Sequence, residues 1–230
     1  MRPKAIIEVL ESTDGFAVSG PVPPLSLGGG VWCPTRALAD AVAAEWRDPP
    51  KSPANKREQI FTHLAIQAVG IKTNFAAAVA SVAAYGASDL LCYRGSEGSP
   101  LAKRQAQLWQ PILDWVSNRH GIVLGVTHDI APIDQDPEQL SRITELVGQF
   151  DPYQLTTVSQ VTSLCGSVII ALALLADEID ESGAWAAGAL DEHFQIETWG
   201  EDTEAMISLA AKRWALAASV RFDLLARDHG

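Results

Sequence analysis

Three prolines within five residues, at positions 49, 50 and 53, divide this chain into two unlike parts. Proline lacks an amide hydrogen and its ring clashes with the preceding turn, so a helix cannot continue through such a cluster. Before it lie short β-prone runs (AIIEV, GFAV, VWC), turn signals (STDG, SGPVPP) and one amphipathic helix from Thr35. After it, almost every segment has helical periodicity. The sequence therefore predicts an α+β fold: a small α+β domain over residues 1–55 and a larger all-helical domain over residues 56–230.

The second part carries the start and stop signals of a series of helices. Ser99 followed by Pro100 predicts a helix that ends at Gly121, because serine caps free amides and proline fits the first helical turn. Asp136-Pro137 repeats the signal, and Gln139 is expected to complete a capping box with Asp136. Further helices are expected at about residues 54–69, 72–85, 152–176, 182–199 and 203–226.

Composition and charge argue against several classes of function. The chain has 28 acidic and 17 basic residues, a net charge of −11. Nucleic acids and anionic membranes are bound by clustered Lys and Arg, so neither is an expected partner. Cys33, Cys92 and Cys165 form no CxxC pair, and no GxSxG, GxxxxGK[ST] or GxGxxG motif occurs. We therefore expect no cofactor, metal or nucleotide, and the sequence does not favour an enzyme.

The N-terminal sequence predicts neither export nor mitochondrial import. In MRPKAIIEVLE the apolar run AII ends at Glu8, which is too short for a secretory signal, and a transit peptide avoids acidic residues. The longest apolar stretch, Leu164–Ala176, falls short of the roughly 20 residues that cross a bilayer. We expect a bacterial cytoplasmic protein without signal or transit peptide and without membrane insertion, in which this stretch is a buried helix.

Nearly all of the net charge lies in residues 177–204. This segment holds ten carboxylates and no Lys or Arg, whereas the rest of the chain has 18 acids and 17 bases. Trp185, Phe194, Ile196 and Trp199 are interleaved with these carboxylates. Acids mixed with aromatic side chains indicate a surface for a protein partner rather than a solvated tail.

The sequence LDEHFQIETWGED, at residues 190–202, predicts a helix with two apolar faces. At 100° per residue, Glu197 falls on one apolar face and Glu192 on the other. A carboxylate on an apolar face is costly unless it is paired. The partner can be a buried arginine or a helix terminus of the same chain, or an arginine or backbone amides of a bound protein, and the sequence leaves both open. Gly200 ends the helix, and Asp202 is expected to cap the next one.

Several blocks, in the same order along the chain, resemble the assembly chaperones for the α subunit of F(1), the catalytic head of ATP synthase, of the mitochondrial and alpha-proteobacterial type. LDEHFQIETWGED resembles the C-terminal signature of that family. The other blocks are GFAV and PTRALADAVAAEW in the first part, SDLLCYR at 88–94, the W-x-P-x-L-D-W pattern at 109–115, and Asp151-Pro152 followed by SLCGSVIIALAL.

The resemblance implies a binding protein rather than an enzyme. A chaperone of this family binds the unassembled α subunit, shields its apolar subunit interface and hands it over for ATP synthase assembly. The implied partner-binding residues are Asp191, Glu192, Gln195, Glu197, Trp199, Glu201 and Asp202. The structural motif residues are Asp89, Arg94, Trp109, Asp114 and Trp115. Asp89 and Arg94 lie five apart around LLCY and are expected to pair across a turn, and both tryptophans are expected in the core.

The alternative function is a carboxylate-based hydrolase that uses the acidic cluster at 191–202. It would require two carboxylates in one pocket with separated pKa values. A metal site at Asp191-Glu192-His193 is not expected, because consecutive helical residues diverge by 100°. The chain also departs from the family pattern: SGPVPPLSLGGG replaces the usual LDGRPVxTP hairpin, and His63 and Ile66 stand where the family has an Arg and an Asn.

Overall fold

The computed structural model describes residues 6–20, 30–48, 59–129 and 131–227. The chain forms two compact units. The sheet unit comprises residues 1–75, 151–156 and 218–230, and the helical unit comprises residues 76–150 and 157–217. The predicted α+β fold class is confirmed. The domain boundary expected between residues 55 and 56 lies outside the described residues, as does most of the replaced hairpin at 21–29.

The sheet has three antiparallel strands in the order β1-β2-β3. The strands are β1 (Glu8–Ser12), β2 (Gly15–Ser19) and β3 (Gly30–Cys33). The predicted strands GFAV and VWC are therefore present, whereas AIIEV is displaced toward the C-terminus. The turn at STDG fixes this register, pairing Ser12 with Gly15. Gly15 has a φ of 141°, and a Cβ there would lie 2.5 Å from the Cys33 carbonyl oxygen, so glycine is required.

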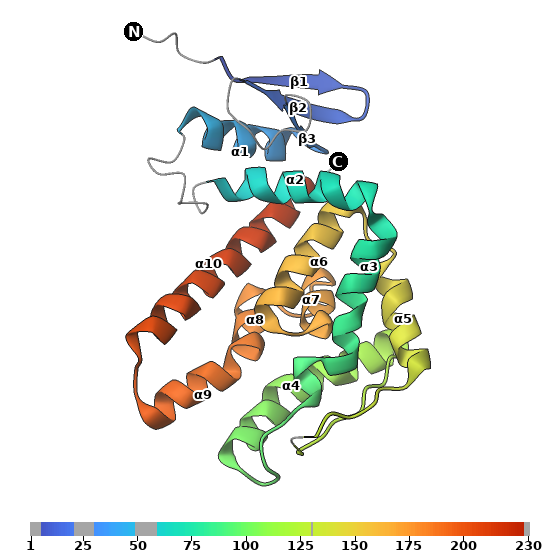
Figure 1. Cartoon of the computed structure of the whole chain (residues 1–230), viewed down its shortest axis with the longest axis vertical. Helices are drawn as coiled ribbons and strands as arrows, with labels where there is room; N and C mark the ends of the chain where they lie inside the picture. Colours follow the sequence, from blue (N-terminus) through green and yellow to red (C-terminus); the bar gives the residue numbers. More distant parts are fainter. Residues whose placement is uncertain (1–5, 21–29, 49–58, 130, 228–230) are drawn as a thin grey trace. The chain divides into compact units, whose positions relative to one another are not determined.

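Two helices, α1 (Arg36–Arg47) and α2 (Ile60–Thr73), lie on the same side of this sheet (Figure 1). The Thr35 hydroxyl caps α1 by accepting from the Leu38 amide at 3.1 Å, as the sequence predicts. The Glu45 carboxylate of α1 accepts from the Phe61 and Thr62 amides at 2.8 and 2.9 Å, which caps α2. The core of the unit is apolar and includes Val18, Val31, Leu38, Val42 and Phe222.

The helical unit consists of α-helices and two 3-10 turns. They are α3 (Phe75–Ala83), η2 (Ala84–Ser88), η3 (Leu90–Cys92), α4 (Pro100–His120), α5 (Pro137–Val147), α6 (Pro152–Cys165), α7 (Val168–Leu175), α8 (Glu181–Gly188), α9 (Leu190–Trp199) and α10 (Thr203–Ala226). α6 and α10 each run from one unit into the other.

The predicted helix ends are largely confirmed. Ser99 caps α4 by accepting from the Ala102 amide at 3.1 Å, and Gly121 ends it in the left-handed conformation. Asp136 caps α5. The capping box is wrong, however, because the Gln139 side chain turns away and accepts from the Val123 amide at 2.8 Å.

Two predicted helices are each divided in the structure. The helix expected at 152–176 breaks at Gly166, which has a φ of 69°, and Ser167 caps α7. The helix expected at 182–199 breaks at Ala189 into α8 and α9. Near this second break a Cβ on Gly188 would lie 2.7 Å from the Cys165 sulfur, so close packing on α6 places the chain there. Neither break interrupts the apolar pattern, so periodicity alone did not reveal them.

One stretch, Phe75–Cys92, is long and apolar enough to cross a membrane by length and composition alone. In the structure it is divided into α3 and the two 3-10 turns, and 39% of it is buried. The core helix of a folded domain passes the same test, so this is weak evidence for a membrane span.

Candidate functional site

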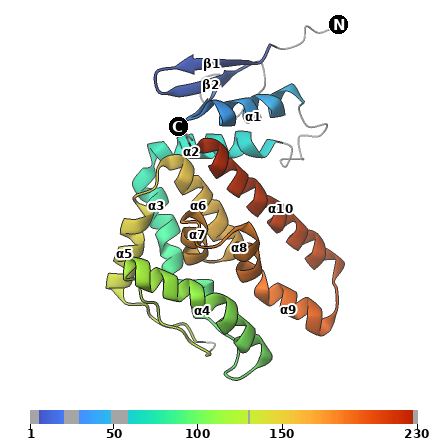
Figure 2. The same cartoon turned by 180° about the vertical axis from the view of Figure 1, so that it is seen from behind.

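The acidic segment folds into α8, α9 and the first turn of α10. Figures 1 and 2 show α9 leading into α10 through a short connection. That connection depends on Gly200, whose φ of 93° and ψ of 170° lie in a region that essentially only glycine adopts. Asp202 then caps α10 by accepting from the Ala205 amide at 2.8 Å, as predicted. Glycine and aspartate together set where α9 ends and α10 begins.

The end of α8 and the start of α9 are held against α4. The Gln105 side-chain amide of α4 donates to Asp191 at 2.8 Å, and the Trp109 indole donates to the Ala187 carbonyl at 2.9 Å. Burial raises the pKa of Asp191, the bond from Gln105 opposes this, and the charge of Glu192 adds to the rise. Asp191 therefore faces α4 and helps to hold α9 in place.

Two further carboxylates of α9 have basic partners within the helical unit. Arg104 contacts Glu197 at 2.6 Å and lies over the Phe194 ring. Lys212 of α10 contacts Glu192 at 3.0 Å. The first pair matches the internal alternative left open for Glu197, although the arginine is not buried. Exposed pairs of this kind contribute at most about 1 kcal/mol, so either can be exchanged for another partner.

The end of α9, the connection and the first turns of α10 expose large apolar side chains among acids. Trp199 is 77% exposed, Ile207 63% and Met206 40%, and Glu201 and Glu204 are exposed beside them in the chain. We call these five residues the turn surface. Sequence reasoning found Trp199 and Glu201 but missed Met206 and Ile207. At 100° per residue, Met206, Ile207 and Ala210 fall within about 100° of one another on α10, and this spacing would have grouped them as an apolar stripe.

A groove of about 310 Å³ lies between α9 and α10 beside the same connection, and Trp199 of the turn surface is part of its lining. Glu192, Ile196 and Trp199 line it from α9, and Leu209 and Lys212 line it from α10. Gln195 and Asp202, also predicted to bind the partner, lie in this lining. The groove therefore brings together four of the seven predicted partner-binding residues. The other three, Asp191, Glu197 and Glu201, lie outside its lining.

The predicted pair of Asp89 and Arg94 is wrong. Asp89 is fully buried and accepts from the Leu91 and Ile169 amides at 3.1 and 3.2 Å. The Arg94 guanidinium instead donates to Gln110 at 2.9 Å. Asp89 therefore joins the 3-10 turn η3 to the first turn of α7, because the amides there need an acceptor.

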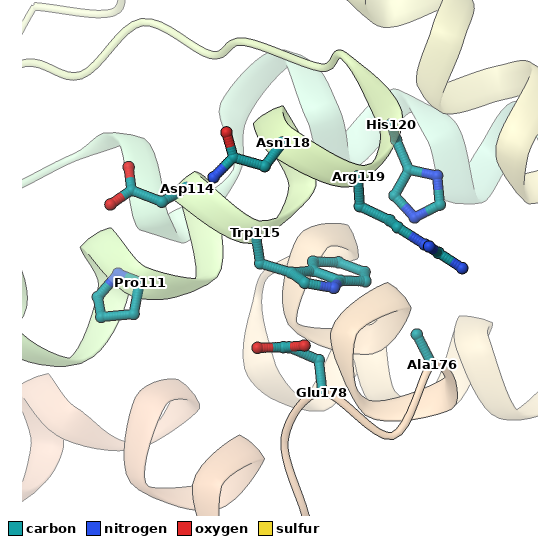
Figure 3. Close-up of a pocket in the computed structure, with 8 residues that line it drawn as sticks. All are labelled: Pro111, Asp114, Trp115, Asn118, Arg119, His120, Ala176 and Glu178. Atoms are coloured by element: carbon teal, nitrogen blue, oxygen red, sulfur yellow. The ribbon is translucent and has the colours of Figure 1, made fainter.

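The three remaining motif residues lie on α4. Trp109 is completely buried, as predicted, whereas Trp115 is only half-buried and Asp114 is exposed. Trp115 lines an open hollow of about 900 Å³. Figure 3 shows its ring over the segment that carries Ala176 and Glu178. Two acidic residues, Asp114 and Glu178, and two basic residues, Arg119 and His120, line this hollow.

The arrangement of the carboxylates favours binding over hydrolysis. Asp191 and Glu197 have partners outside the groove. Glu192 and Asp202 both line the groove, but Lys212 and the Ala205 amide already bind them, whereas a hydrolase needs two carboxylates that act together on one bond. Among the described residues, no group of three His, Cys, Asp or Glu side chains is placed to hold a metal ion.

Comparisons with known proteins identify the family. The family model described as ATP12 chaperone protein matches residues 27–117. The crystal structure of Atp12 from Paracoccus denitrificans has 33% sequence identity and a TM-score of 0.86, covering 96% of this chain and 96% of that one. The chain belongs to the ATP12 chaperone family.

Two further structures agree with membership of the ATP12 family. An aspartate-to-lysine mutant of Paracoccus denitrificans Atp12 has 33% identity and a TM-score of 0.87, covering 98% of this chain and 97% of that one. A candidate chaperone from Agrobacterium tumefaciens, the Atu1473 protein, has 30% identity and a TM-score of 0.83, covering 94% and 82%. The ATP12 family model ends before the signature at 190–202, but the structural likeness extends over it. The ATP12 assignment confirms the resemblance and makes this chain an ATP synthase assembly chaperone, which acts on a protein client.

Proposed function

We propose that the protein binds the unassembled α subunit of F(1)-ATPase through the turn surface, shields its apolar subunit interface and hands it over for assembly in the bacterial cytoplasm. The observation that carries the proposal is the exposure of Trp199, Ile207 and Met206 among carboxylates. An exposed apolar patch rimmed by polar groups is typical of a protein-binding site. The family assignment supplies the context of ATP synthase assembly.

The chemistry of the turn surface fits a client that awaits its ring neighbours. A subunit destined for a ring exposes an apolar interface that aggregates when uncovered. Apolar side chains can cover such an interface, while the surrounding carboxylates attract basic groups and speed the encounter. Release needs no nucleotide hydrolysis, because a subunit partner with higher affinity displaces the chaperone by mass action. The chaperone thus acts as a binding protein, not as an enzyme.

Co-expression with the α subunit tests this proposal. Trp199→Ser and Ile207→Ser should each lower the affinity for the α subunit by about tenfold, as expected for central apolar anchors. The soluble fraction of the α subunit should then fall toward the level without chaperone. Val123→Ser is the matched control, because Val123 is 61% exposed against 63% for Ile207 and lies elsewhere on the helical unit. Equal losses from Ile207→Ser and Val123→Ser, with both variants folded, would refute docking at the turn surface.

A further inference from the structure

The α9–α10 groove has an apolar floor with a charged group at each end. Ile196 and the buried Leu209 form the floor, and the exposed Trp199 ring forms a wall. Asp202 lies at the end next to the connection, and Glu192 lies at the opposite end. Glu192 and Trp199 are seven residues apart on one helix, so the groove is about 10 Å long at 1.5 Å per residue. That length suits one or two side chains of a bound polypeptide.

Lys212 is the only basic residue in the lining of this groove. Its ammonium group contacts Glu192 at 3.0 Å, and the two side chains are 41% and 38% exposed. Because both remain open to water, the pair is weak and the flexible lysine stem can swing aside. Glu192 is therefore accessible to a second cation that arrives with a partner.

We propose that the groove receives an apolar side chain of the α subunit that stands beside an arginine or lysine, and that this client cation replaces Lys212 on Glu192. Lys212 is then an internal substitute for the client. It keeps Glu192 paired while the chaperone is empty, and it returns to Glu192 when the client leaves. The inference rests on the proposed function, since it assumes that the α subunit docks at α9 and α10.

Charge and shape both favour a basic, apolar occupant. Residues 177–204 contain ten carboxylates and no Lys or Arg, so the helix that forms one wall attracts cations. Arginine fits Glu192 especially well, because its planar guanidinium binds a carboxylate through two parallel hydrogen bonds. An acidic segment would instead meet Glu192 and Asp202 at the two ends of the groove and be repelled.

Binding of the purified α subunit to four full-length proteins tests this exchange: wild type, Lys212→Met, Glu192→Gln and the double variant. Lys212→Met removes the internal competitor but keeps the apolar stem, so the α subunit should bind about two- to fivefold more tightly. Glu192→Gln should bind more weakly than wild type. In the double variant the gain from Lys212→Met should vanish, because the carboxylate for which the cations compete is absent. Unchanged or weaker binding by Lys212→Met, or a gain that persists in the double variant, would overturn the proposal.

Controls separate this inference from general charge effects and from the proposed function. Lys72→Met removes the same charge from an exposed position on α2, and an affinity gain equal to that of Lys212→Met would also overturn the exchange. If the wild type does not bind the α subunit, or if Trp199→Ser and Ile207→Ser bind normally, the proposed function itself fails. If those variants weaken binding while Lys212→Met brings no gain, the exchange alone fails. If Lys212→Met does not fold, Lys212→Gln repeats the test. If either variant forms a dimer, the groove is assigned to a second copy of the chain and the proposal is rejected.

Discussion

At the scale of single residues, Asp89 illustrates how a buried carboxylate can organise a fold. It lies between η3 and α7 and accepts amide hydrogens from both. Burial raises its pKa to about 6, against the opposing hydrogen bonds from Ser167, Leu91 and Ile169. The folded chain thus holds a proton on Asp89 more tightly than the unfolded chain, in which the pKa is about 3.9. The resulting stability is present below about pH 4 and is lost as the pH rises through 6.

We therefore expect Asp89→Asn to flatten the dependence of the unfolding free energy on pH. In the wild type, this group should remove up to about 3 kcal/mol between pH 4 and pH 7, since one pKa unit corresponds to about 1.4 kcal/mol. Urea unfolding at several pH values measures both proteins. Burial raises the pKa of Glu45 and of Asp191 as well, so the difference between variant and wild type isolates Asp89. Parallel pH profiles would show that Asp89 does not titrate in this range.

At the scale of elements, the connection between α9 and α10 depends on one backbone conformation. Gly200 has a φ of 93°, and nothing lies within 4 Å of a Cβ built there, so strain alone opposes a side chain. Gly200→Ala should cost about 1–3 kcal/mol of unfolding free energy and increase hydrogen exchange in the first turns of α10. Gly70→Ala is the control, because Gly70 lies inside α2 with no positive φ and the same open space. That change should be neutral or stabilising by up to about 1 kcal/mol, and equal losses from both would refute the argument.

The same connection shows which features a sequence reveals. The caps at Ser99, Asp136 and Asp202 depend on residues a few positions away, so local pattern predicts them correctly. The break at Gly166 was missed because α7, which follows it, is apolar throughout, and apolar residues on every side leave no periodicity to interrupt. The break at Ala189 was missed because it accompanies the close approach of Gly188 to Cys165, a contact distant in sequence.

The candidate site shows the same limit more strongly. The acidic helix and the tryptophan near its end were evident from the sequence, and the family resemblance pointed to them, whereas the exposure of Trp199 came from the structure. The partners of its carboxylates were not, because Gln105, Arg104 and Lys212 lie on other helices. Spacing in the sequence predicts which side chains share a helix face. Which side chains of different helices contact each other depends on how α4, α9 and α10 pack.

At the scale of the whole molecule, charge is distributed very unevenly along the chain. Ten of the 28 acids lie within residues 177–204, and the remaining residues are nearly neutral, with 18 acids and 17 bases. Field lines from such a segment reach a charged partner before contact, which raises the association rate. Salt reduces this effect, since charges are screened beyond about 8 Å at physiological ionic strength. The acidic segment should therefore act mainly on the rate of encounter with the α subunit.

Changing Glu201 and Glu204 together to Gln tests whether the acidic segment speeds the encounter. Both side chains are exposed, and neither caps α10, since Asp202 does so. The association rate constant with the α subunit should fall about two- to tenfold at low salt, with less change in the dissociation rate constant, and the difference should shrink as salt is added. Glu8 and Glu11, both exposed on β1, provide a control pair that removes the same two charges from the sheet unit. Stopped-flow measurement at two ionic strengths gives both rate constants. If association slowed equally in both double variants, the effect would come from net charge alone. The steering would then belong to the molecule as a whole rather than to the segment at 177–204.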